Sequence, residues 1–309
     1  MDRRWVRVCG TFMREFSVPR GAIRIPDRRG AWAVRSFHRR STRNTITYYS
    51  EAHRSITSMN APVLNLSRPP IVEAVVDIDC DMPPAMEIAA LEARARDLFI
   101  SRYPKFRTQF IQEHQIKQEA SAPPEMSVRR GIQALQFFQE DEKQLVQVRS
   151  QGFSFNRLAP YSSLDDYLSE IEQTWRLFVE LAAPVQIRLI RLRYINRILL
   201  PMTAGRVDLD DYLKIGPRLP DEDKLTIVGF LNQHSAVETS TGNRINIVLT
   251  AQQQEGDKLP VIFDIEAFGS VDSEPNNWAS IHSKIQSLRK LKNLVFENTL
   301  TDRCLKLFQ

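Results

Sequence analysis

The pattern of residues 61–183 recurs in residues 184–309, and this repeat constrains the fold more than any other feature of the sequence. Each half begins with a strand of alternating apolar and polar residues, and each ends with a helix that carries a tryptophan, Trp175 or Trp278. A single half would leave a helix-covered sheet with exposed edges, which favours aggregation. We therefore predict an α+β fold: an internally duplicated strand–helix–three-strand–helix unit forms one long curved antiparallel sheet with helices on one face.

The first half opens with residues 71–79, whose period-two alternation is typical of a half-buried strand. The other elements predicted for this half are a helix that starts at Pro83-Pro84, strands at 106–117, 131–139 and 144–149, and a helix after Pro160. We expect the third of these strands to continue through Phe153 and Phe155 after a bulge at Gly152.

The second half repeats this order after Pro184, which ends the preceding helix. Its predicted elements are a strand at 185–199, a short helix at 207–214, strands at 224–233, 244–251 and 260–268, and a final helix with an apolar stripe. The arrangement has the logic of TBP-like and helix-grip folds. This is an analogy of fold, and it carries no implication of DNA binding.

Composition places the chain among ordinary globular proteins, with 42% hydrophobic and 26% charged residues among 309. No stretch approaches the ~18–20 consecutive apolar residues of a membrane helix, so we predict no membrane insertion. The three cysteines, Cys9, Cys80 and Cys304, are far apart and form no Cys-x-x-Cys motif, which favours a reducing compartment. We therefore expect a cytoplasmic protein, and the exposed sheet edges are compatible with a homodimer.

Positive charge is concentrated at the start of the chain. Residues 1–60 contain 13 Arg, no Lys and four acidic residues, a net charge of +9, so the remaining residues carry −4 of the total of +5. Three interpretations stay open for this Arg-rich extension: translation from too early a start, with Met59 as the natural one; a disordered arm; or a basic arm that binds nucleic acid.

Arg191, Arg193 and Arg197 alternate onto one face of the strand at 185–199, while Asn196 shares the other face with Tyr194. Three guanidinium groups in a row suit a phosphate or carboxylate ligand, because each can bind such oxygens with two hydrogen bonds. The alternative is that the arginines pair across the sheet with acidic residues of the equivalent first-half strand.

The acidic residues that would serve in this alternative are Glu73 and Asp77, if the two strands are central neighbours. Asp264 and Glu266 form a second pair of carboxylates on one strand face, and these could hold a metal, act as acid and base, or pair with the arginines. The five histidines show no metal-binding spacing, and no nucleophile or phosphate-loop motif is present. We therefore assign no catalytic residue, no metal and no cofactor.

Several blocks of sequence resemble one known family. They are L-N-L-S-R-P-P-I-V-E-A-V-V-D-I (64–78), F-S-F-N-R-L-A-P-Y (153–161), R-L-R-Y-I-N-R-I (191–198), D-I-E-A-F (264–268), H-S-K-I (282–285) and F-E-N-T-L-T-D (296–302). On these blocks residues 64–309 resemble the TIGR04255 family, a sporadically distributed prokaryotic family with no assigned function. Residues 288–294 look like an insertion relative to that pattern. The resemblance implies a fold-level grouping and supplies no catalytic residues.

These observations predict a non-enzymatic binding or regulatory protein that uses an open sheet face to hold a protein partner or a small anionic ligand. The sporadic distribution that the resemblance implies suits an accessory or defence-type system. One alternative is a nucleic-acid-binding protein that uses the basic arm. Another is a metal-assisted hydrolase that uses Asp264, Glu266 and Glu73.

Overall fold

The computed structural model describes residues 5–8, 11–14, 66–84, 86–117, 125–220, 224–225 and 227–309. The chain divides into two compact units, Met1–Ala61 and Pro62–Gln309. In the first unit, β1 (Trp5–Val8) and β2 (Thr11–Arg14) form an antiparallel hairpin. The other residues of the predicted Arg-rich extension, 1–60, lie outside the described residues.

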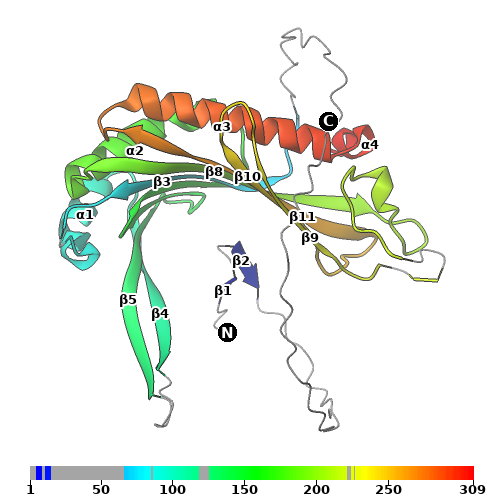
Figure 1. Cartoon of the computed structure of the whole chain (residues 1–309), viewed down its shortest axis with the longest axis horizontal. Coiled ribbons are helices and arrows are strands. Elements are labelled where there is room, and N and C mark those ends of the chain that lie inside the picture. Colours follow the sequence, from blue (N-terminus) through cyan, green and yellow to red (C-terminus); the bar gives the residue numbers. More distant parts are fainter. Residues whose placement is uncertain are drawn as a thin grey trace, which may run out of the picture. The chain divides into compact units, whose positions relative to one another are not determined.

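The second unit contains a nine-stranded sheet in the order β4-β5-β6-β7-β3-β8-β11-β10-β9, and every neighbouring pair is antiparallel. The strands are β3 (Ile71–Asp81), β4 (Lys105–Lys117), β5 (Glu125–Phe138), β6 (Gln144–Arg149), β7 (Gly152–Leu158), β8 (Gln186–Pro201), β9 (Leu231–Val237), β10 (Arg244–Ala251) and β11 (Lys258–Ser273). The predictions of an α+β fold and of one large antiparallel sheet are confirmed. Figure 1 shows that the sheet curves and that β4 and β5 project from it as a ribbon.

Two long helices, α2 (Asp165–Ala182) and α3 (Trp278–Thr299), lie along the same face of the sheet (Figure 1). The shorter helical segments are η1 (Ile88–Leu91), α1 (Glu92–Phe99), η2 (Leu209–Asp211), α4 (Asp302–Leu305) and η3 (Lys306–Phe308). α3 begins where the Asn277 side chain accepts a hydrogen bond from the Ser280 amide, and α2 ends where Ala183 adopts a left-handed conformation before Pro184. No helix of the described residues has the length and apolarity to cross a bilayer.

The core lies between the sheet and these helices. The central strands contribute Ile78, Ile190 and Ile265, none of which has any accessible surface. Trp175 of α2 is also buried, and its indole Nε1 donates to the Pro275 carbonyl oxygen at 2.9 Å. Because this bond reaches the turn before α3, it ties the two long helices together.

The predicted bulge at Gly152 is wrong. Gly152 pairs with Arg149 at the end of a hairpin, so β6 and β7 are separate strands and the first half has four strands after its helix, not three. Gly152 has a φ of +146°, and a Cβ there would lie 2.0 Å from the Ile78 carbonyl oxygen. Only glycine can make that approach to the neighbouring strand.

Two boundaries of the second half also differ from prediction. The strand predicted at 224–233 is β9, Leu231–Val237, and the helix predicted at 207–214 is the single turn η2. The Asp208 side chain accepts a hydrogen bond from the Asp210 amide and so caps a turn that is too short to become an α-helix. By contrast, α3 runs through 288–294 without a break.

Candidate functional site

The candidate arginines lie on β8, which pairs with β3 at the centre of the sheet. In this register Asp77 lies opposite Arg191, and Val75 lies opposite Arg193. Opposed residues project to the same face, so the arginines and the acidic residues of β3 share the face of the sheet opposite α2 and α3. The predicted arrangement of β3 and β8 as central neighbours is confirmed.

Each of these arginines pairs with a carboxylate. The Arg193 Nε donates to both Asp264 oxygens at 2.9 and 3.1 Å, and an Arg191 amino group lies 2.6 Å from Asp79. Arg197 pairs at 2.5 Å with Glu255, in the turn before β11. The three ion pairs are Arg191–Asp79, Arg193–Asp264 and Arg197–Glu255. Pairing across the sheet is confirmed, and so is the predicted pairing of Asp264 with an arginine, but the partners Glu73 and Asp77 are wrong.

The partners differ because the two predicted acids have other donors and the β3–β8 register shifts at both ends. Glu73 accepts a hydrogen bond from the Asn156 Nδ2 at 2.7 Å, and Asp77 accepts one from the Ser154 hydroxyl. Burial raises the pKa of Glu73 above its usual range, although the bond from Asn156 and the charge of Arg193 oppose this shift.

A chain of side-chain amides continues across the same face from Glu73 to β4. Asn156 accepts from Gln147 at 2.9 Å, Gln147 accepts from Gln136 at 3.0 Å, and Gln136 also donates to Gln109 at 3.2 Å. Each amide therefore has a partner on a neighbouring strand. A satisfied polar network of this kind stabilises the alignment of strands and leaves few groups free for a ligand.

The acid pair on β11 has no metal-site geometry. Asp264 binds Arg193, whereas Glu266 accepts from the Asn246 Nδ2 at 2.9 Å. Among the described residues no group of three or more His, Cys, Asp or Glu side chains could hold a metal ion. Cys80 and Cys304 are buried free thiols, and burial raises the pKa of each to about 12. Neither thiol is ionised as a metal ligand or a nucleophile would be.

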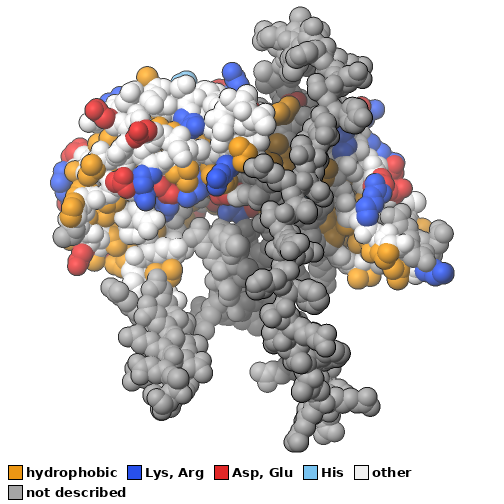
Figure 2. Space-filling model, viewed as in Figure 1, with side chains coloured by type: hydrophobic (Ala, Val, Ile, Leu, Met, Phe, Trp, Pro, Cys, Tyr) orange, Lys and Arg blue, Asp and Glu red, His pale blue; other side chains and the backbone are white. Residues whose placement is uncertain are grey.

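The surface charge of the second unit is mixed. In Figure 2 the Lys and Arg side chains of the described residues are interspersed with Asp and Glu. The described residues visible in this view form no continuous basic surface of the kind that binds nucleic acid. The prediction that a basic arm binds nucleic acid rests on residues 1–60, most of which lie outside the described residues.

The largest cavity described, of about 390 Å³, lies on the helix-covered side, where the start of β3, the start of α2 and the second half of α3 meet. Four segments far apart in sequence line it: 66–71, 161–164, 194–196 and 289–297. Asn196 is the predicted candidate that reaches this cavity. Its Nδ2 donates to the Phe263 carbonyl oxygen at 2.9 Å, and the side chain is almost fully buried.

Lys292 of α3 lines this cavity. Its ammonium nitrogen lies 4.0 Å from the centre of the Tyr194 ring, and no carboxylate of the described residues forms an ion pair with it. Burial, and to a lesser extent the positive charge of Arg289, lowers the pKa of Lys292 from 10.5 to about 7, while Glu297 opposes the shift. Lys292 therefore exchanges between charged and neutral forms close to neutral pH.

The polar groups beside Lys292 are held in place by each other. Arg289 binds both oxygens of Asp165 at 2.7 and 2.9 Å, which lowers the pKa of that carboxyl. The hydroxyls of Tyr161 and Tyr194 are 2.8 Å apart, and burial raises the pKa of both, that of Tyr194 to about 12. Both hydroxyls stay neutral at physiological pH.

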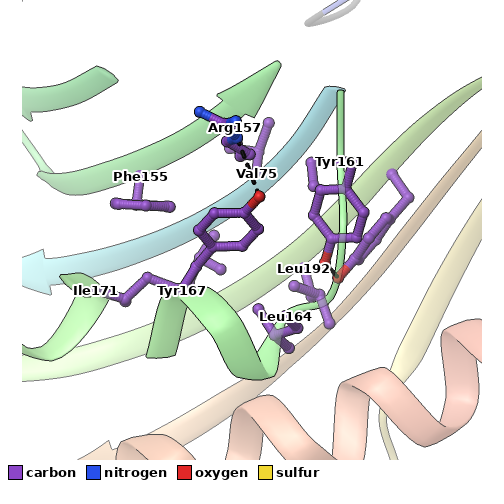
Figure 3. Close-up of a pocket in the computed structure, with 11 residues that line it drawn as sticks. Val75, Phe155, Arg157, Tyr161, Leu164, Tyr167, Ile171 and Leu192 are labelled. Atoms are coloured by element: carbon purple, nitrogen blue, oxygen red, sulfur yellow. Dashed lines mark hydrogen bonds between the residues drawn. The ribbon is translucent and has the colours of Figure 1, made fainter. Parts of the chain in front are cut away.

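A second, much smaller cavity of about 10 Å³ shares Tyr161 and Leu164 with the large one, and Figure 3 shows both side chains at its edge. In the same view the Arg157 Nε donates to the Tyr167 hydroxyl at 3.2 Å. This space holds at most one water molecule. Of these two cavities, only the larger can hold an organic ligand.

The sequence analysis missed Lys292 because it treated residues 288–294 as an insertion. The signal was present: Ile285, Leu288, Lys292 and Phe296 follow one another at helical spacing along the buried side of α3. A lysine in an otherwise apolar stripe indicates either a snorkelling side chain or a functional amine. The cavity beside it favours the second.

No protein-family model matches the sequence, and neither a curated protein nor a solved structure matches the chain. The resemblance to the TIGR04255 family therefore stays a prediction. The function has to be argued from the geometry of the site itself.

Proposed function

We propose that this protein is a binding or regulatory protein that holds a small anionic ligand in the cavity beside Lys292. The sheet-face arginines first predicted for this role support it less well, because carboxylates of the same chain occupy them. The observation that carries the proposal is a partly desolvated ammonium without a carboxylate partner among the described residues, at the wall of a cavity of about 390 Å³.

The other lining groups suit the same ligand. Asn293 adds an amide donor, and Arg289 keeps guanidinium N–H groups beyond those that bind Asp165. The hydroxyls of Ser162 and Ser163 also line the cavity, but they already bind Tyr167 and Asp165. The Pro69-Pro70 segment and Phe296 supply apolar walls. A cavity of this size with a few convergent polar groups is typical of sites for small organic molecules.

Binding of an anion beside Lys292 favours the ammonium form and so raises its pKa. The complex should therefore take up protons between pH 7 and 9. Calorimetric titration of the full chain in two buffers of different ionisation enthalpy measures this uptake, with oxalate, phosphate and sulfate as probes and chloride at matched ionic strength as the reference.

We expect at least one of these anions to raise the unfolding temperature with proton uptake. Lys292→Met should abolish both effects. Lys290→Met is the matched control, because Lys290 is exposed two residues away on α3. The proposal is wrong if no probe binds, or if Lys292→Met binds the anions as well as the wild type does.

We also propose that the second unit arose by internal duplication, as the sequence repeat predicts. Two features of the sheet support this. The last strand of each half lies beside the first strand of the same half, β7 beside β3 and β11 beside β8. The two first strands, β3 and β8, pair antiparallel at the centre of the sheet. The first half has one strand more than the second, the edge strand β4, so the repeat is imperfect. The TBP-like analogy, a protein partner and a homodimer stay predictions.

A further inference from the structure

We propose that Lys292 forms an imine with a carbonyl-bearing anion, an aldehyde or ketone that also carries a carboxylate or phosphate group, in the cavity at the start of α2. This inference rests on the proposed function and names the chemical class of its ligand. In this proposal Lys292 forms a covalent bond to the ligand, whereas the proposed function requires only an electrostatic contact.

The geometry provides what imine formation requires. Lys292 lines a cavity large enough for a small organic molecule, its nitrogen lies 4.0 Å from the centre of the Tyr194 ring at the same wall, and no carboxylate of the described residues holds it as an ion-paired ammonium. Burial and the neighbouring Arg289 keep a large fraction of the amine neutral near pH 7. A neutral amine is the form that attacks a carbonyl carbon.

The reaction is a reversible condensation without any redox change. The amine lone pair forms the new C–N bond, the carbonyl C–O bond breaks, and the oxygen leaves as water with the two hydrogens of the amine. One proton taken from solvent then gives the protonated imine. The Tyr194 ring, whose face already lies against the Lys292 nitrogen, stabilises this cation.

The rest of the cavity selects for an anion. The protonated imine keeps the positive charge of Lys292, and Arg289 adds a second cation that Asp165 holds in position. The Asn293 amide and the N–H groups of Arg289 that Asp165 does not bind can donate to the oxygens of a carboxylate or phosphate group. A neutral aldehyde could react with the amine, but it has no anionic group to accept hydrogen bonds from these donors.

The test is reductive trapping of the full chain at pH 7 with cyanoborohydride and either glyoxylate, an aldehyde carboxylate, or pyridoxal 5′-phosphate, an aldehyde phosphate. The reductant converts an imine to a stable secondary amine, which peptide mass mapping locates. We expect Lys292 to be labelled at least about ten-fold faster than exposed Lys290, because far more of it is neutral. Oxalate or phosphate should suppress the label.

Lys292→Arg is the variant that separates the two proposals. It keeps a cation but cannot form an imine, so it should still bind oxalate or phosphate and should yield no label in the peptide; its unfolding curve reports whether it is folded. Labelling spread over the exposed lysines would overturn the imine proposal. If the anions still bind in that case, the proposed function survives; if they do not bind, both fail. A label on Lys292 that neither anion suppresses would also overturn the imine proposal as stated.

Discussion

Replacing Lys292 with methionine should stabilise the protein, and by an amount that depends on pH. A fall in pKa from 10.5 to about 7 corresponds to a cost of about 4–5 kcal/mol for the buried ammonium form. Lys292 is only half-buried and its charge is attracted by the Tyr194 ring, so we take about half of that figure, about 2 kcal/mol at pH 7. Methionine has a similar length and no charge to desolvate.

The direction with pH follows from proton binding. The pKa is lower in the folded protein than in the unfolded chain, so the unfolded chain binds more protons between pH 7 and 10.5, and the stability of the wild type rises with pH over that window. The advantage of Lys292→Met should therefore shrink from about 2 kcal/mol at pH 7 to less than about 1 kcal/mol at pH 9.5.

Urea unfolding at pH 7 and pH 9.5, followed by circular dichroism, measures both values. The other titratable groups facing Lys292 are Arg289, Glu297, Tyr161 and Tyr194, and because wild type and variant share them, the difference between the two isolates Lys292. Lys290→Met should change stability little at either pH. If Lys292→Met destabilises the protein equally at both pH values, the amine is not desolvated and the reasoning about the cavity fails.

Three further predictions concern the sheet. Arg193→Gln and Asp264→Asn should each lower the free energy of unfolding by about 3 kcal/mol, as measured by urea unfolding in a double-mutant cycle. The double variant should lose at least about 1 kcal/mol less than the sum of the two, and strict additivity would contradict the ion pair. Glu73→Gln should raise the free energy of unfolding at pH 7 by about 1 kcal/mol, because it removes a buried charge. Below pH 4.5 Glu73 is protonated in both the folded and the unfolded protein, so the variant should be no more stable than the wild type there. Gly152→Ala should lower stability by at least about 3 kcal/mol, against about 1 kcal/mol for Gly256→Ala, where no atom lies within 4 Å; equal losses would argue against the close strand approach.

Periodicity predicted the elements in which one face is buried throughout. Residues 71–79 place their acidic side chains on one face and form β3, and the Trp175 and Trp278 segments form the two long helices. The predictions were wrong where a local sequence pattern is compatible with two different structures. A glycine within an apolar run can mark a bulge or a hairpin, and at Gly152 the approach of Ile78, 74 residues earlier, decides between them.

The partners of the charged side chains are hard to predict for a related reason. Alternation correctly placed Arg191 and Arg193 on one face, and it left both Glu73 and Asp264 as possible partners of the arginines. It could not decide that Asp264 binds Arg193 while Asn156 binds Glu73, because those partners depend on strand order and on register shifts. A pattern within one strand reports which side chains share a face. It does not report which of them are already bound.

The difference between bound and available charge is what moves the functional interpretation from the open sheet face to the cavity. On the open face, Asp264 already neutralises the charge of Arg193, and removing either partner would leave the other charge unpaired. A structural role in the sheet is therefore enough to explain both residues. The lowered pKa of Lys292 predicts that the charged form costs stability where it stands, and that an apolar residue at that point in the stripe of α3 would stabilise the fold. A side chain that destabilises its own fold while facing a cavity of ligand size is explained more simply by what it binds than by what it packs against.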